Sequence, residues 1–166
     1  ISGNLGPRGD GYVASRKMGV DEAQAYHAPQ IDTFADTAAD MVSAFTLNYI
    51  EEAIGVARAA QAADMPIAVS FTLETDGRLP SGMPLAEAIE ATDDATAAHP
   101  AYYMINCAHP SHFAHVLHDA GPGHRGGHVH HRRHDRPAQP PRHRRRVVDA
   151  VLQAQHQRAG FEVRRH

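Results

Sequence analysis

The sequence predicts an α/β protein built on a parallel sheet, and three observations support this prediction. Short apolar segments rich in Val, Ile, Phe and Tyr alternate, along the first 120 residues, with segments whose apolar residues recur at helical spacing. Proline and glycine residues separate the two kinds of segment. Polar side chains follow the ends of the apolar segments. Strands that alternate with helices form right-handed βαβ units, in which neighbouring strands run parallel.

The first predicted unit contains a strand end, a loop and a helix. Residues 1–7 run into a glycine-rich loop over residues 3–12, whose glycines permit positive φ and close backbone approach to a ligand. A plain turn is the alternative, because the loop matches neither of the common phosphate-binding spacings. The helix is predicted to begin at Asp21, with Gln24 completing a capping box, and to be kinked or delayed by Pro29. Its expected apolar face consists of Ile31, Phe34, Ala35 and Ala38.

Three further strands and three further helices are expected. Asn48 and Glu51 have the spacing of a second capping box, and Pro66 separates the helix after them from the next strand. Leu85, Ala88, Ile89 and Thr92 give the following helix one apolar face. In chain order these elements are a strand at 41–47, a helix at 48–63, a strand at 67–73, a helix from Pro84 to Pro100, a strand at 102–106 and a short helix at 111–120.

The carboxyl ends of these strands are the expected site, because parallel α/β sheets bind ligands there. Polar residues collect at four such ends: Gly3-Asn4, Thr46 to Asn48, Thr72 to Glu74, and Asn106-Cys107. Cys107 is the only cysteine, which excludes an internal disulfide and favours a reducing compartment, so we expect a cytoplasmic protein. A lone cysteine in this position is also compatible with a small buried hydrophobe.

Charge divides the chain into two parts. Residues 1–120 carry five basic and sixteen acidic side chains, a net charge of −11, whereas residues 121–166 carry eleven Arg and three acidic side chains, a net charge of +8. The second part also contains eight of the fourteen His and shows no apolar period up to residue 146, so it cannot build a core. We therefore predict a domain at residues 1–120 and a basic His/Arg/Pro-rich tail at residues 121–166.

The tail has several interpretations. It is expected either to be disordered or to be read in a shifted frame, since a one-base shift in a GC-rich gene converts Ala, Gly and Asp codons into Arg, His and Pro codons. A basic arm for nucleic acid and a His-rich metal-binding tract are the functional alternatives. Nucleic acid is the less favoured of these, because the body of the chain is acidic and no aromatic residues interleave with the Arg cluster.

Length limits the architecture. A chain of 166 residues holds a real core but is shorter than the roughly 250 residues of a complete (β/α)8 barrel. The chain begins at Ile1 and its first residues already read as a strand end, so we expect an amino-terminal truncation. No apolar run reaches about 18 residues, so no membrane span is expected.

Four segments of residues 1–120 together resemble a known family. They are Gly3-Asn4-Leu5-Gly6-Pro7; Asp40-Met41-Val42 through Phe45-Thr46 with Glu52-Ala53; Ser70-Phe71 with Asp76-Gly77 and Gly82-Met83-Pro84-Leu85-Ala86-Glu87-Ala88; and Ile105-Asn106-Cys107 with Pro110. In this order and spacing they resemble the homocysteine S-methyltransferases. These are zinc-dependent (β/α)8 barrels that transfer a methyl group to the sulfur of homocysteine.

The resemblance implies a fold, a cofactor and a set of site residues. The fold would be an incomplete (β/α)8 TIM-barrel fragment of about four βα units with an irregular C-terminal tail. The partners would be a small-molecule thiol substrate and a methyl donor, and the cofactor would be zinc, which holds the thiol as a thiolate. The resemblance assigns Cys107 as a zinc ligand and places Asn106 in the substrate pocket, with Gly3 and Ser70 lining the strand-end cleft. Glu74 is a further candidate for substrate binding.

The sequence also departs from the family. The family's other two thiolate ligands come from a Gly-Gly-Cys-Cys-Gly stretch, and this chain has no second cysteine. Phe45 stands where the family carries a glutamate for the substrate amino group, and Glu74 or Asn48 would have to replace it. Four His near Cys107 either complete a Cys–His site or line a solvated helix face: His109, His112, His115 and His118.

These departures lead to two functional predictions. The first is a homocysteine S-methyltransferase-like protein that is inactive as this chain. The alternative is a non-catalytic barrel remnant whose basic, His-rich tail serves as an interaction or metal-binding segment. A half barrel would leave sheet edges unpaired, so self-association of the incomplete barrel is also expected.

Overall fold

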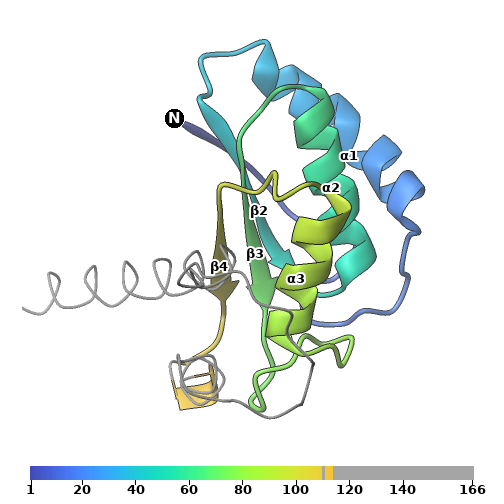
Figure 1. Cartoon of the computed structure of the whole chain (residues 1–166), viewed down its shortest axis with the longest axis vertical. Helices are drawn as coiled ribbons and strands as arrows, with labels where there is room; N and C mark the ends of the chain where they lie inside the picture. Colours follow the sequence, from blue (N-terminus) through green and yellow to red (C-terminus); the bar gives the residue numbers. More distant parts are fainter. Residues whose placement is uncertain (110, 114–166) are drawn as a thin grey trace, which may run out of the picture.

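The computed structural model describes residues 1–109 and 111–113, which form one layer of sheet and one layer of helices (Figure 1). The strands are β1 (Ser2–Leu5), β2 (Met41–Leu47), β3 (Ile67–Thr72) and β4 (Tyr102–Asn106). They are parallel throughout and lie in the order β1-β2-β3-β4. Each strand therefore pairs with the next one in sequence. The predicted α/β class and the partial TIM-barrel architecture of four parallel strands alternating with helices are confirmed.

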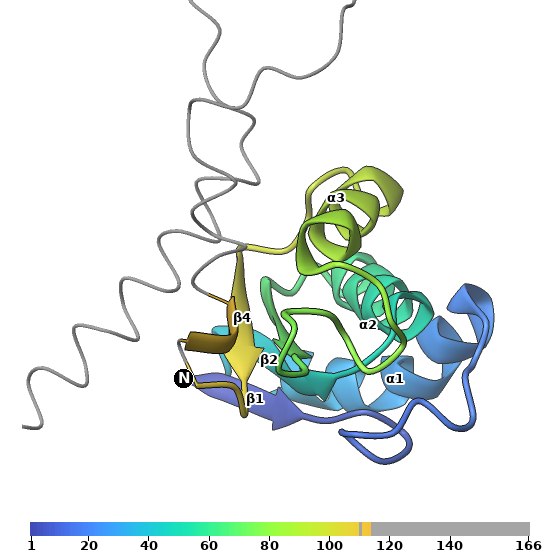
Figure 2. The same cartoon turned by 90° about the horizontal axis from the view of Figure 1, so that it is seen from below.

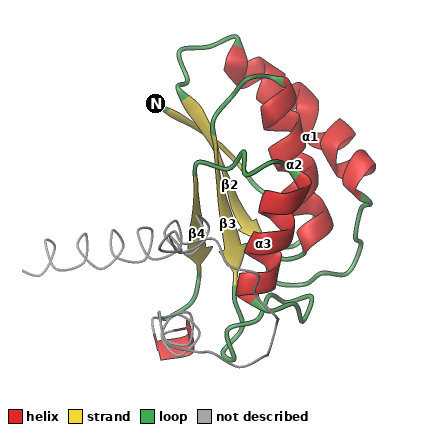
Figure 3. Cartoon of the chain, viewed as in Figure 1, coloured by secondary structure: helices red, strands yellow, loops and turns green. Residues whose placement is uncertain are grey.

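Three helices cover one face of this sheet (Figures 1 and 3). They are α1 (Val20–Ala35), α2 (Ile50–Ala62) and α3 (Leu85–Ala95). The view turned by 90° shows the same arrangement, with the sheet on one side and all three helices on the other (Figure 2). Since each helix follows its strand and returns along the same face, the carboxyl ends of all four strands lie at one edge.

The helices α1 and α2 approach each other closely at Gly55. A Cβ atom added at Gly55 would lie 2.4 Å from the Cβ of Ala23 and 2.8 Å from the carbonyl oxygen of Val20. Only a residue without a side chain fits there, although glycine has a low helix propensity. This contact fixes the relative position of the two helices that carry the buried His27 and Glu52.

The core lies between the sheet and the helices. On the sheet it contains side chains from all four strands that point toward the helices, and Val69, Phe71 and Tyr103 are no more than 2% exposed. Phe71 and Tyr103 stack with their ring centroids 6.2 Å apart. Because side chains alternate along a strand, Ser70 and the other residues between these positions point to the opposite, barrel-interior side.

The strand β2 contains an irregularity just before its end. Ala44 pairs with Val69 but Leu47 pairs with Phe71, so three steps along β2 correspond to two along β3. Thr46 lies within this bulge and has a φ of 56°. The extra residue returns Leu47 to the buried core, and Phe45 and Thr46 are only partly buried at the site edge.

The structure confirms most predicted elements and corrects two helix starts. The strands at 41–47 and 102–106 are confirmed, and β3 ends at Thr72, one residue before the predicted end. In α3 the four predicted face residues are all buried, and the helix starts directly after Pro84.

Both predicted capping boxes are wrong. The N-cap of α1 is Gly19 and that of α2 is Tyr49, and neither residue makes a side-chain capping hydrogen bond. Asp21 lies within the first turn of α1, and Asn48 precedes the cap of α2, where its amide bonds to a neighbouring loop. The helix α1 is already regular from Val20 and includes Pro29, so the predicted delay of the helix at this residue is wrong, and the predicted kink stays a prediction.

Predictions about the carboxyl-terminal region fall mostly outside the described residues. Residues 111–113 are helical, and the rest of the helix predicted at 111–120, together with the tail at 121–166, lies outside them. The tail's disorder or frame shift therefore stays a prediction. Within residues 1–109 and 111–113, no helix is long and apolar enough to cross a membrane.

Candidate active site at the carboxyl ends of the strands

The loop between β1 and α1, residues 6–19, folds across the carboxyl end of β2. A Cβ atom at Gly11 would lie 2.9 Å from the Cβ of Thr46, so glycine permits the close approach. The side-chain amide of Asn48 donates a hydrogen bond of 2.6 Å to the carbonyl oxygen of Asp10. The glycine-rich loop singled out in the sequence is thus part of the strand-end edge, close to the end of β2.

Cys107 follows β4 directly and presents an exposed thiol at this edge. Its φ is 56°, a left-handed conformation that is uncommon for a residue other than glycine. The hydroxyl of Tyr12 donates a hydrogen bond of 3.1 Å to its Sγ. This hydrogen bond and the charge of the thiolate, with smaller effects of burial and Asp10, raise the pKa of Tyr12. The structure therefore brings together two residues that lie 95 positions apart.

Asn106 connects β4 to β2. Its Oδ1 accepts a hydrogen bond of 2.9 Å from the backbone N–H of Thr46. The two strands are separated by β3, so this side chain reaches across the end of the intervening strand. Asn106 thus organises the edge of the site, and its role in binding a substrate stays a prediction.

The other predicted substrate-binding residues occupy different places. Gly3 is buried within β1, where a Cβ atom would lie 2.6 Å from the ring of Phe34, so it faces α1 rather than the strand-end edge. Ser70 is fully buried in β3, and its hydroxyl has no hydrogen-bond partner among the described residues. Glu74 is exposed in the loop after β3. Their substrate contacts stay predictions.

The described residues do not provide a complete zinc site. Within residues 1–109 and 111–113, no group of three His, Cys, Asp or Glu side chains converges on a point where a metal ion would fit. The rings of His109 and His112 lie 6.1 Å apart, and Nδ1 of His109 bonds to the hydroxyl of Ser111. His115 and His118 lie outside the described residues. Cys107 is therefore a single candidate ligand in this part of the chain.

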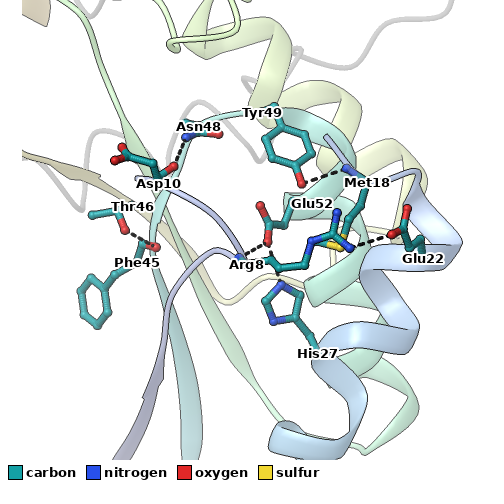
Figure 4. Close-up of polar contacts among 10 residues, drawn as sticks. All are labelled: Arg8, Asp10, Met18, Glu22, His27, Phe45, Thr46, Asn48, Tyr49 and Glu52. Carbon is teal, nitrogen blue, oxygen red and sulfur yellow. Dashed lines mark hydrogen bonds and ion pairs between the residues drawn. The ribbon is translucent and has the colours of Figure 1, made fainter. Parts of the chain in front are cut away.

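A buried polar cluster lies behind this edge, between the loop and the two helices (Figure 4). Oε1 of Glu52 accepts a hydrogen bond of 2.7 Å from the backbone N–H of Arg8 and lies 3.0 Å from Nε2 of His27. The hydroxyl of Tyr49 accepts a hydrogen bond of 3.1 Å from the backbone N–H of Met18. His27, Tyr49 and Glu52 are each no more than 4% exposed.

The cluster favours an ionised carboxylate at Glu52. Burial acts to raise the pKa of Glu52, but the hydrogen bonds from His27 and the Arg8 amide, with the nearby Tyr49, outweigh burial and lower it. Burial and the negative charge of Glu52 raise the pKa of Tyr49 to about 12. The hydroxyl therefore stays protonated at neutral pH.

This cluster is not recognisable as a unit from the sequence. Glu52 lies among alanine, isoleucine and valine on a helix that is buried along most of its length. A charged residue in an apolar stretch is a signal for a buried, paired charge. Its partner His27 lies 25 positions away on another helix, and no spacing rule connects the two.

Comparison with known proteins identifies the family. A family model described as homocysteine S-methyltransferase matches residues 1–154. The chain belongs to the homocysteine S-methyltransferase family. The match extends beyond residue 120 into residues that the structure does not describe, and the predicted domain boundary at residue 120 stays a prediction.

Solved structures of a family member have the same fold. The homocysteine methyltransferase MmuM from Escherichia coli in its metallated form is 26% identical, with a TM-score of 0.61 over 72% of this chain and 43% of that chain. Its apo form is 24% identical, with a TM-score of 0.58 over 70% of this chain and 44% of that chain. The chain described here thus spans less than half of the MmuM chain. A search of curated proteins found no match to this chain.

Proposed function

We propose that the chain represents the part of a homocysteine S-methyltransferase that contributes Cys107 as one thiolate ligand of zinc. The observation that carries this proposal is the exposed thiol directly after β4, at the edge where the strands of a parallel sheet present their functional residues. The family match and the metallated form of MmuM support zinc as the cofactor. Homocysteine and a small-molecule methyl donor would be the substrates.

The same reasoning predicts that this chain alone is inactive. Zinc that binds a substrate thiol needs three protein ligands and one open position. The chain contains one cysteine, and the described residues bring no further ligands to it. In addition, position 45 carries phenylalanine where the family carries a glutamate for the substrate amino group. We therefore expect this chain to form the strand-end edge with Cys107 but not to form the complete three-ligand zinc site.

The proposal is tested with two forms of the protein. The first is the chain as given, and the second is a version extended to the length of the family by translating the tail in its alternative reading frame. Each is made with Cys107 intact and with Cys107→Ser. Zinc content is measured by elemental analysis, and methylation of homocysteine is measured with S-methylmethionine as the donor.

We expect little zinc and no turnover from the chain as given. The extended version should hold about one zinc ion and show turnover, and Cys107→Ser should abolish both. Turnover by the chain as given would contradict its predicted inactivity. An extended version that retains zinc after Cys107→Ser would contradict the ligand role. If neither frame restores a cysteine pair, zinc or turnover, the non-catalytic remnant with an interaction or metal-binding tail is the better description.

We also propose that the chain is a cytoplasmic protein, in a reducing compartment. Copies of the chain are expected to associate with one another. A partial barrel has two strands at the ends of its sheet, and exposed backbone groups at a sheet edge pair readily with another chain. We expect sedimentation velocity of the chain under reducing conditions to show species larger than a monomer. A single sharp monomer peak with no binding of an apolar dye would contradict this expectation.

A further inference from the structure

The loop at residues 6–19 is held at three points by the segment that begins α2. We propose that Asn48, Tyr49 and Glu52 are positioning residues, which we call the loop clamp, and that they hold the hydroxyl of Tyr12 against the thiol of Cys107. The inference deepens the proposed function, because it rests on Cys107 being the functional thiol of this edge. None of the three clamp residues contacts Cys107 in a hydrogen bond or ion pair of the described structure, so they act through the loop.

Each clamp residue forms a hydrogen bond to a backbone atom of the loop. Glu52 accepts from the N–H of Arg8, Tyr49 accepts from the N–H of Met18, and Asn48 donates to the carbonyl of Asp10 (Figure 4). These contacts lie at the start, at the end and within the loop. The three clamp residues are 4% exposed or less, so water does not compete for the hydrogen bonds.

A second set of hydrogen bonds connects Asp10, which Asn48 holds, to the backbone of Tyr12. Oδ1 of Asp10 accepts from the backbone N–H groups of Tyr12 and Val13, at 2.7 Å and 3.1 Å. This turn fixes the direction of the chain at the residue that Asn48 holds. The side chain of Tyr12 is 57% exposed and nevertheless reaches Cys107 with its hydroxyl. The loop clamp therefore fixes the position of Tyr12, whose exposed side chain is not held by a surrounding core.

The buried charge of Glu52 is explained by this role. Burying a carboxylate is unfavourable unless it is paired, and apolar residues of similar volume often stabilise a core equally well. An apolar side chain at position 52 would pack against α1 but would leave the Arg8 amide without an acceptor. His27 keeps the carboxylate ionised, and its second nitrogen has no partner among the described residues.

The first test is limited trypsin digestion of the full chain. The loop contains three exposed cleavage sites at Arg8, Arg16 and Lys17, and the exposed Arg78 in the loop after β3 reports on the rest of the fold. Tyr49→Phe and Glu52→Ala should each raise cleavage at the first three sites by about fivefold relative to Arg78. Glu52→Gln retains an acceptor and should restore most of the protection. Tyr102→Phe, which removes a hydroxyl from β4, is the matched control.

The second test asks whether the clamp acts through Tyr12. The rate of Cys107 alkylation by iodoacetamide is measured at a pH of about 9.5, where an ordinary thiol is ionised. Tyr12→Phe and Tyr49→Phe should each raise the rate several-fold, because hydrogen bonding and shielding both slow a thiolate. The double variant should be no faster than the faster single variant, since both changes remove the same interaction.

Two results would overturn the inference. Cleavage that rises equally at Arg78 would show that the clamp residues stabilise the whole fold and not the loop. Additive alkylation rates in the double variant would show that the clamp does not act through Tyr12. Neither measurement uses zinc or methyl transfer, so failure of the proposed function would leave both readouts unchanged.

Discussion

The backbone N–H of Thr46 donates a hydrogen bond of 2.9 Å to Oδ1 of Asn106, although β3 separates the strands that carry the two residues. Thr46 lies in the bulge of β2 with a φ of 56°, and Asn106 is the last residue of β4. The contact therefore joins a conformationally strained residue to the residue that precedes Cys107. It makes the shape of the site edge depend on both strand ends.

Replacing Asn106 should show how much this hydrogen bond contributes to the free energy of unfolding. Asn106→Ala leaves the Thr46 amide without its acceptor, and we expect the free energy of unfolding to fall by about 1–3 kcal/mol. Asn106→Asp keeps an oxygen in the same place and should lose less. Urea unfolding followed by circular dichroism measures both variants. Equal stability of the alanine variant and the parent would mean that water replaces the side chain at no cost.

Glycine at position 46 should be tolerated better than a side chain. A left-handed φ is unfavourable for a β-branched residue by about 1 kcal/mol or more, and glycine removes this penalty. Thr46→Gly should therefore be neutral or stabilising in the same unfolding measurement. Thr72→Gly, in the regular strand β3, is the control and should destabilise the protein by about 1 kcal/mol. Similar losses at both positions would contradict the strain at Thr46.

The Glu52 carboxylate should make stability depend on acid. Its pKa lies below the ordinary value of 4.5 in the folded protein, so the ionised form stabilises the fold. This contribution is fully present above pH 4.5 and is lost as the pH falls through the lower, folded pKa. Glu52→Gln has no such ionisation. We therefore expect the parent to exceed the variant in urea stability at pH 7, and the difference to shrink below about pH 4.5.

Other carboxylates affect both proteins of this pair alike, so the difference isolates position 52. The groups that face this carboxylate are the His27 ring, the Arg8 amide and guanidinium, and the Tyr49 hydroxyl, and none of them is substituted in the variant. A difference that stays constant from pH 7 to pH 3 would show that the charge at Glu52 does not stabilise the fold.

A methyl group at Gly55 should separate α1 from α2. Gly55→Ala improves helix propensity by about 1 kcal/mol, but its Cβ would meet the backbone of α1, and overpacking of this kind costs about 1–3 kcal/mol. We expect a net loss of stability. Gly6→Ala is the control, because a Cβ there meets nothing within 4 Å. It should change the unfolding midpoint little, and an equal effect at both positions would rule out the steric explanation.

The strands and their order were predictable because burial and chain direction determine them. The segments at 41–47 and 102–106 are apolar, end at polar residues and are bounded by Pro or helix-forming runs, and these signals are local. The helix starts were not predictable in the same way. Asn48 has the side chain of a capping residue, but its amide instead donates to the carbonyl of Asp10, in a loop 38 residues earlier in the chain.

The site was predictable in position but not in its supporting contacts. Parallel strands place Cys107 and the residues before it at one edge, whatever the details of packing. The contact between Tyr12 and Cys107 depends on the path of a loop, and the pair of His27 and Glu52 depends on how two helices pack. Neither relation leaves a period or a spacing in the sequence.

The consecutive strand order has a consequence for synthesis on the ribosome. Because every strand pairs with the one made just before it, each new βα unit can dock as soon as it emerges, without waiting for a distant partner. The nascent chain is then a growing sheet whose two open edges are its first strand and its most recent strand. Growth of this kind lets a barrel assemble one unit at a time, from its amino-terminal strands onward.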